Sequence, residues 1–199
     1  MKKTVLAFLA RELGLSGLAA LIESERYEPI CVITHKLLPR SEEPQRLQRP
    51  DFKEYQKLTA KHGIPLYTVD TKKEQELIEE ALSEMPFDLI ASISWRRLIP
   101  VALIERASLG GVNLHRGRLP DYPGGEPIKQ ALNRGDTSIT ISAHILTAEI
   151  DAGEVICQRS HPVSLSERLS QTANIDRIKR QITPLFGPLL IQALDKLMV

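Results

Sequence analysis

The sequence predicts an α/β fold: a mainly parallel, twisted sheet with helices on both faces and a C-terminal antiparallel hairpin. The first observation is that short apolar runs, typical of buried strands, alternate with helical patterns from residue 4 to residue 114. The second is that Pro29–Thr34 is almost continuously apolar, as expected of a parallel strand covered on both faces. The third is that apolar and polar residues alternate from Ile139 to Ile145, which predicts a strand with one partly polar face.

Glycines, prolines and capping residues divide the first half of the chain into elements. Gly14–Gly17 is expected to be a turn, and Gly63 ends a later helical pattern. Asp70 or Thr71 can cap the start of the next helix. Prolines among charges make Lys36–Asp51 an expected surface loop. The expected strands are Thr4–Leu9, Pro29–Thr34, Pro65–Val69 and Asp88–Ser94. The expected helices are Leu18–Ser24, Phe52–His62 and Lys72–Glu84.

The second half begins with a short helix and a short strand, and then changes to antiparallel pairing. Pro100 can start the helix, and Gly135 can end a later one. The expected helices are Pro100–Ala107, Glu126–Asn133 and most of Ser166–Met198, with interruptions near Pro184 and Pro188. The expected strands are Gly111–Leu114, Ile139–Leu146 and Glu154–Arg159, the last two forming the hairpin. No repeat or linker is visible, so residues 1–199 are expected to form a single domain.

Composition narrows the class of protein. A net charge of +1 over 199 residues argues against a protein that coats a polyanion. No apolar run approaches the ~20 residues needed to span a bilayer, which argues against a membrane partner. Arg11 and Glu12 cut short the N-terminal apolar run, which therefore fits a first strand better than a signal peptide. Cys31 and Cys157 lie in apolar runs without CxxC spacing and are expected to be free thiols in the cytoplasm.

Three polar residues follow strand-like runs and could perform acid–base chemistry. Histidine near neutral pH can take and return a proton, because its ordinary pKa is about 6.5. Asn113 lies two residues before His115, so both side chains point to the same side of a strand. Asp151 could orient the His115 ring, while the Asn113 amide could donate to an oxygen that gains negative charge. From the residues alone, however, a histidine at a strand end is more often only hydrogen-bonded.

Other candidate sites are weaker. The sequence has no HExxH, HxH or CxxC spacing, so no metal site is expected, and no GxGxxG motif for a dinucleotide. His35, His62 and His161 are expected to be surface or capping residues, whereas His144, on a strand face, stays undecided. Two loops carry arginines that could contact phosphate or form a solvated rim: Arg96, Arg97, Arg116 and Arg118.

Three motifs together resemble one enzyme family. They are Asn113-Leu114-His115, the loop Leu119-Pro120-x-Tyr122 with Gly124 and Pro127, and Asp151-Ala152-Gly153. In order and spacing they are similar to formyltransferases that use 10-formyltetrahydrofolate, over roughly Thr4 to Leu197. The resemblance implies a Rossmann-like domain, 10-formyltetrahydrofolate as cosubstrate, and Asn113, His115 and Asp151 as the catalytic residues. It also implies a pterin pocket lined largely by backbone groups of Ser94, Trp95, Arg96, Arg97, Leu98, Thr147, Ala148, Glu149 and Ile150.

The acceptor of the formyl group is less defined. The loop departs from the family pattern at Gly117, usually serine, and at Arg118, usually leucine. We expect a small phosphorylated or nucleotide-linked amine held by Arg116, Arg118 and Tyr122, with an amino sugar nucleotide as the best guess. A lone domain of near-zero charge leaves little surface for a nucleic acid. The alternatives are methionyl-tRNA, glycinamide ribonucleotide, water as acceptor, or a folate-binding module that has lost catalysis. The oligomeric state is left open.

Overall fold

The computed structural model describes residues 1–198 and is built on a seven-stranded sheet. The strands are β1 (Lys3–Leu9), β2 (Tyr27–Thr34), β3 (Leu66–Thr68), β4 (Leu89–Ile93), β5 (Gly111–His115), β6 (Ser138–Ile145) and β7 (Val155–Pro162). The helices are α1 (Arg11–Glu23), α2 (Phe52–Lys61), α3 (Lys72–Ala81), α4 (Val101–Arg106), α5 (Pro127–Asn133), α6 (Gln171–Ile182) and α7 (Phe186–Leu197), with the short 3-10 helix η1 (Thr183–Leu185) before α7.

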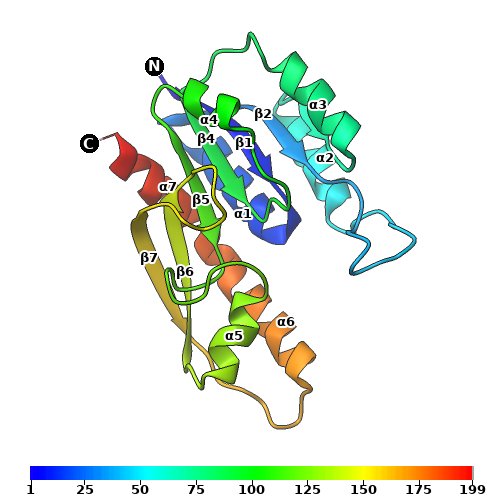
Figure 1. The fold of residues 1–199 in the computed structure, drawn as a ribbon, viewed down its shortest axis with the longest axis vertical. Helices are drawn as coiled ribbons and strands as arrows, with labels where there is room; N and C mark the ends of the chain where they lie inside the picture. Colours follow the sequence, from blue (N-terminus) through cyan, green and yellow to red (C-terminus); the bar gives the residue numbers. More distant parts are fainter. Residues whose placement is uncertain (199) are drawn as a thin grey trace.

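The sheet confirms the predicted class. Its strand order is β3-β2-β1-β4-β5-β6-β7, and the pairs from β3 to β5 are parallel. The pairs β5–β6 and β6–β7 are antiparallel, so the hairpin forms one edge of the sheet (Figure 1). The order turns back between β1 and β4, and crevices beside such a reversal are where open α/β sheets usually bind ligands.

Two apolar layers cover the two faces of the sheet. On one face, α1 and α7 pack against each other and against a core that includes Val112 and Leu114 of β5. On the other face, α3 and α4 cover a smaller core built on β1, β2 and β4. Because neighbouring side chains of a strand alternate in direction, Asn113 and His115 point away from the α1–α7 side. Over β5 and β6 this second face is covered by loops, and the polar residues collect there.

Two sequence expectations about elements are wrong, for reasons of packing. The first helix begins at Arg11 and not at Leu18, because the expected turn glycines lie inside it and allow close packing. A Cβ on Gly17 would lie 2.5 Å from Ile93, and one on Gly14 would lie 2.3 Å from the Tyr55 hydroxyl. Pro188 does not interrupt the last helix, because it falls in the first turn of α7, where proline is tolerated.

The segment Lys36–Asp51 is more tightly held than a surface loop. Its Leu37 forms an isolated bridge with Gln48, and the Asp70 carboxylate accepts hydrogen bonds from the Lys36 and Leu37 backbone. The Arg49 side chain is fully buried and forms an ion pair of 2.7 Å with Asp51. This buried pair anchors the loop on the start of α2.

Three further features of residues 1–198 are the state of the cysteines, the character of the helices and the grouping of possible metal ligands. Cys31 and Cys157 are buried free thiols, and burial raises the pKa of Cys31 to about 12. None of the helices in residues 1–198 is both long and apolar enough to cross a bilayer. No three His, Cys, Asp or Glu side chains among these residues are grouped so that they could hold a metal ion.

Candidate active site

The site is built on the antiparallel pair β5–β6. Asn113 of β5 lies directly opposite His144 of β6, and His115 lies opposite Ser142. The Asn113 Nδ2 atom is 2.9 Å from His144 Nε2. All these side chains point to the loop-covered face, because Val112, Leu114 and Ala143 between them are in the core. The strand pair therefore presents an amide and two imidazoles side by side.

Asp151 reaches this group from the loop between β6 and β7. Since β6 runs antiparallel to β5, the loop leaves near the amino end of β5 and folds back across the strand (Figure 1). The Asp151 Oδ2 atom lies 3.1 Å from His115 Nδ1 and accepts the Gly124 backbone N–H at 2.9 Å. Its Oδ1 atom lies 3.4 Å from both Asn113 Nδ2 and His144 Nε2. Asn113, His115 and Asp151 thus meet, although they are far apart in the sequence.

Backbone geometry at two residues makes this return of the chain possible. Asp151 itself has φ of +52°, in the left-handed region that non-glycine residues rarely adopt. A Cβ on Gly153 would lie only 1.8 Å from the Ile145 carbonyl oxygen, so no other residue fits there. The Asp-x-Gly spacing therefore serves a loop that is pressed against the end of β6.

The charges in the site are set by burial and by these contacts. Burial opposes ionisation of Asp151, but its contacts with the His144 ring, the His115 ring and the Gly124 N–H together hold its pKa below the ordinary value. Burial is also the largest influence on His115 and lowers its pKa, against the opposing effects of the Asp151 carboxylate and the Tyr122 carbonyl. At neutral pH the site therefore contains a carboxylate beside a neutral imidazole.

Both ring nitrogens of His115 face oxygen atoms. Nδ1 faces the Asp151 carboxylate, and Nε2 lies 2.7 Å from the Tyr122 carbonyl oxygen. An ionised carboxylate accepts only, so we assign the single hydrogen of the neutral ring to Nδ1. Nε2 then carries a lone pair in the neutral ring and donates to the Tyr122 carbonyl only when the ring is protonated. A ligand N–H that replaced this carbonyl would satisfy the ring.

The three residues expected to hold the acceptor differ in their surroundings. The Tyr122 side chain is buried and donates its hydroxyl to Asp136. Arg118 is exposed and pairs with Asp121 at 2.6 Å and with Asp136 at 3.5 Å. Arg116, in contrast, is half-buried and makes no hydrogen bond or ion pair with any residue from 1 to 198. Burial, followed by the nearby Arg11, lowers the Arg116 pKa, while Glu42 raises it. Of the three, only Arg116 has an uncommitted charge.

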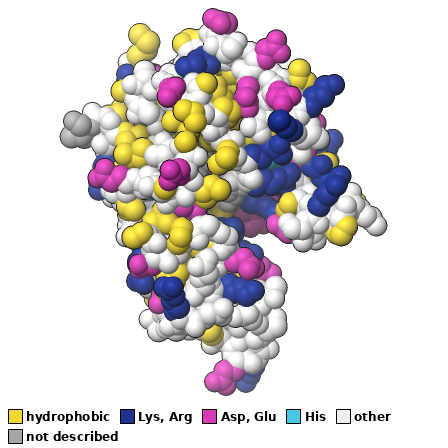
Figure 2. Space-filling model, viewed as in Figure 1, with side chains coloured by type: hydrophobic (Ala, Val, Ile, Leu, Met, Phe, Trp, Pro, Cys, Tyr) yellow, Lys and Arg dark blue, Asp and Glu magenta, His cyan; other side chains and the backbone are white. Residues whose placement is uncertain are grey.

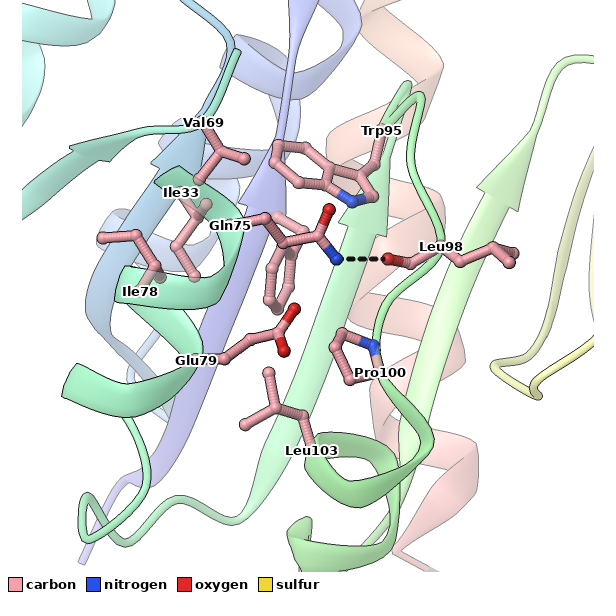
Figure 3. A pocket seen from close by; sticks show the side chains of 10 residues that line it. Ile33, Val69, Gln75, Ile78, Glu79, Trp95, Leu98, Pro100 and Leu103 are labelled. Atoms are coloured by element: carbon pink, nitrogen blue, oxygen red, sulfur yellow. Dashed lines mark hydrogen bonds between the residues drawn. The ribbon is translucent and has the colours of Figure 1, made fainter. Parts of the chain in front are cut away.

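The expected cofactor loop Ser94–Leu98 follows β4. Arg96 donates to the Leu37 carbonyl and pairs with Asp70 at 2.7 Å, while Arg97 donates to Gln75. Trp95 turns inward and lines an apolar cavity of about 10 Å³, roughly one water molecule in size (Figure 3). Leu98 points away from that cavity, and its side chain is 58% exposed. The side chains of this loop are thus mostly occupied, while part of its backbone is free.

A wider hollow lies beside the same loop. It is an open groove of about 600 Å³ between α3 and the segment 96–100, lined by Lys72, Gln75, Glu76, Glu79, Arg96, Arg97, Leu98 and Pro100. On this face of the molecule lysine and arginine side chains gather around the loop 36–51 (Figure 2). The second expected cofactor segment, Thr147–Ile150, is exposed at its end, where the Ile150 side chain is 70% accessible.

Two histidines lie in places that the sequence did not predict. His35 is 1% exposed, so its surface assignment is wrong: its ring stacks on Trp95 at 4.0 Å between centroids, with Nδ1 facing the Val69 carbonyl. His144 is 2% exposed and touches both Asn113 and Asp151. The signal that could have found His144 is the strand register, because only an antiparallel pairing places it opposite Asn113. His62, at the end of α2, is exposed as expected.

Two comparisons with known proteins indicate the same family. The sequence profile described as formyl transferase matches residues 7–182. A methionyl-tRNA formyltransferase from Bacteroides fragilis is 30% identical over 187 residues, which is 94% of this chain and 54% of that protein. The chain spans about half or less of the length of the curated relatives it matches, since a Staphylococcus epidermidis methionyl-tRNA formyltransferase is covered over only 33%.

Solved structures share the fold. A formyltetrahydrofolate deformylase from Pseudomonas syringae pv. tomato superimposes with a TM-score of 0.72 at 23% identity, covering 98% of this chain and 62% of that one. A glycinamide ribonucleotide transformylase from Symbiobacterium toebii gives a TM-score of 0.72 at 18% identity, covering 97% and 86%. At these identities the likeness establishes the architecture alone.

Proposed function

Because this chain belongs to the formyl transferase family, we propose that it transfers a formyl group from 10-formyltetrahydrofolate to a primary amine. The meeting of Asn113, His115 and Asp151 within 3.4 Å is the observation that carries the proposal. The folate supplies an activated formyl carbon, and the chain supplies an amide donor, a neutral imidazole and a carboxylate. No nucleophilic serine or cysteine is part of this group, which favours direct attack by the amine.

Each residue has a role that follows from its contacts. The Asp151 carboxylate accepts the His115 Nδ1–H and so holds the ring with the Nε2 lone pair available. His115 Nε2, which faces the Tyr122 carbonyl, accepts the proton that the amine loses as its nitrogen bonds to the formyl carbon. The ring then returns this proton to N10 of the folate as the bond between N10 and the formyl carbon breaks. Asn113 donates from its amide to the formyl oxygen as that oxygen gains negative charge. The lowered pKa of His115 keeps the ring neutral, as a general base must be.

Two segments fit the folate. Leu98 and Ile150 are large apolar residues that are 58% and 70% exposed, on the two loops expected to line the pterin pocket. Within residues 1–198, the backbone N–H groups of Arg97 and Leu98 donate no hydrogen bond. Exposed apolar atoms together with free backbone donors suit a flat heteroaromatic ring with polar edges. We therefore assign Ser94–Leu98 and Thr147–Ile150 to the folate.

The acceptor is proposed to be an amine that carries phosphate. Arg116 supports this, because its half-buried guanidinium has no partner among residues 1–198 and can bind a phosphate bidentately. An amino sugar nucleotide remains the best single guess among small acceptors. Methionyl-tRNA is the second candidate, favoured by the name of the curated relatives and by the cations around the loop 36–51 (Figure 2).

Two kinetic comparisons test the roles. His115→Ala and Asp151→Asn are expected to lower turnover by about 10²–10⁴-fold while the affinity for a non-reactive folate analogue changes little. His62→Ala, at an exposed histidine, is the matched control and should keep wild-type turnover. Near wild-type turnover of His115→Ala or Asp151→Asn would contradict the assigned proton transfer.

The acceptor is tested by a panel with 10-formyltetrahydrofolate as common donor: amino sugar nucleotides, glycinamide ribonucleotide and methionyl-tRNA. Arg116→Gln should raise the KM of the acceptor and leave that of the folate unchanged. Arg118→Gln should have the smaller effect, since Asp121 and Asp136 already neutralise that side chain. Efficient turnover of methionyl-tRNA with none of the sugar nucleotides would replace the first candidate by the second.

A further inference from the structure

His144 is a buried histidine for which the proposed reaction has no step. It lies on β6 opposite Asn113, with its Nε2 atom 2.9 Å from the Asn113 amide nitrogen and 3.4 Å from Asp151 Oδ1. We propose that His144 is a positioning residue that fixes the orientation of the Asn113 amide toward the reacting formyl group. The inference rests on the proposed function and adds a fourth member to the site.

The tautomer of His144 follows from its partners. Nδ1 lies 2.9 Å from the Ile145 carbonyl oxygen, which can only accept a hydrogen bond. Nδ1 therefore carries a hydrogen, and Nε2 presents its lone pair to the Asn113 amide nitrogen, which can only donate. The Asn113 amide nitrogen donates to that lone pair. The histidine thus acts toward Asn113 purely as an acceptor.

This acceptor decides which end of the amide faces the site. The Asn113 Nδ2 atom faces two acceptors, His144 Nε2 at 2.9 Å and Asp151 Oδ1 at 3.4 Å. If the Asn113 amide were turned by 180°, its oxygen would face His144 Nε2 and Asp151 Oδ1, and neither contact would contain a hydrogen. One N–H is held by His144. The other makes the longer contact to Asp151 and can exchange it for the formyl oxygen.

The backbone around His144 is shaped to hold the ring. The β6–β7 ladder shifts register between Ala143 and His144, which sets His144 apart from the regular pairing. A Cβ on Gly153 would come within 3.2 Å of His144 Nδ1, besides its clash with the Ile145 carbonyl. Gly153 therefore allows the loop to close over the ring while the Nδ1–H keeps its carbonyl partner. Such close packing limits rotation of the imidazole.

Substitutions that replace one ring nitrogen at a time test the proposal. In His144→Gln the amide oxygen can occupy the position of Nε2 and accept from Asn113. In His144→Asn the polar group reaches only the position of Nδ1, and His144→Leu has no polar group. We expect His144→Leu and His144→Asn to lower kcat by about 10–10²-fold, less than the 10²–10³-fold typical of removing an oxyanion donor. His144→Gln should recover most of the loss, with the folate KM unchanged in all three.

A double-mutant cycle separates positioning from a general loss of packing. If His144 acts through Asn113, His144→Leu should cause no further loss of kcat when Asn113 is already alanine. Equal losses in both backgrounds would overturn the proposal, as would equal activities of His144→Gln and His144→Asn.

The side-chain amide of Asn113, observed by ¹⁵N NMR, gives a readout that needs no turnover. Its two N–H signals should be distinct and slow to exchange in wild type and His144→Gln, and should broaden or exchange faster in His144→Leu. If the two Asn113 N–H signals of His144→Leu were the same as those of wild type, the positioning role would also be overturned. A wild-type chain that transfers formyl to no acceptor would refute the proposed function, and the NMR result would still decide the role of His144.

Discussion

Replacing Gly117 by alanine should strain the loop that covers His115. A Cβ at this position would lie 2.6 Å from Pro127 Cβ, 2.7 Å from the Tyr122 carbonyl oxygen and 2.8 Å from His115 Nε2. The loop cannot simply move away, because the Gly117 carbonyl accepts the Ser142 hydroxyl at 2.7 Å. Overpacking of this kind typically costs about 1–3 kcal/mol. The serine usual in the resembled family would meet the same obstacle.

The effect is measured by calorimetry and by turnover on the same variants. For a chain of this size each kcal/mol lowers Tm by about 2–4 °C. Turnover should fall as well, since a displacement near 1 Å at a reacting group can cost about 10²-fold. Gly125→Ala is the matched control, because a Cβ there would meet nothing within 4 Å. Equal Tm values for Gly117→Ala and Gly125→Ala would refute the argument that the loop is closed on His115.

Two further predictions concern stability. Burial, and next the charge of Arg96, lowers the pKa of His35 to about 3, so the unfolded chain binds a proton below about pH 6.5 that the folded chain does not. The contribution of His35 to the free energy of unfolding is therefore lost as pH falls, by about 2 kcal/mol between pH 8 and pH 5. Urea unfolding should show an acid loss that is larger by this amount in wild type than in His35→Gln, and parallel pH profiles would contradict the assignment. Asp51→Ala should lower the free energy of unfolding by about 3–5 kcal/mol, because it leaves the buried Arg49 unpaired. The double variant Arg49→Met/Asp51→Ala should lower it less. Equal losses in the single and the double variant would show that the ion pair itself provides the stability.

The sequence by itself determined most of the fold. Apolar runs that alternate with helical patterns predicted the parallel sheet, and the alternation after Ile139 predicted the antiparallel edge. These predictions succeed because a strand buried on both faces has a continuous apolar sequence, and a strand buried on one face has an alternating one. The motifs around Asn113, His115 and Asp151 also identified side chains that the fold brings together.

Only the tertiary structure decided which partners each polar side chain has. His144 joins the site through strand register, and His35 is buried because the turn after β4 stacks Trp95 on it. Within residues 1–198 Arg116 has no ion pair, whereas Arg118 is neutralised by two aspartates, although the two arginines look alike in the sequence. Hydrogen bonds and ion pairs between distant segments depend on distances of a few ångströms. Residue order does not encode such distances locally, and they exist only once the sheet, its helices and its loops have packed.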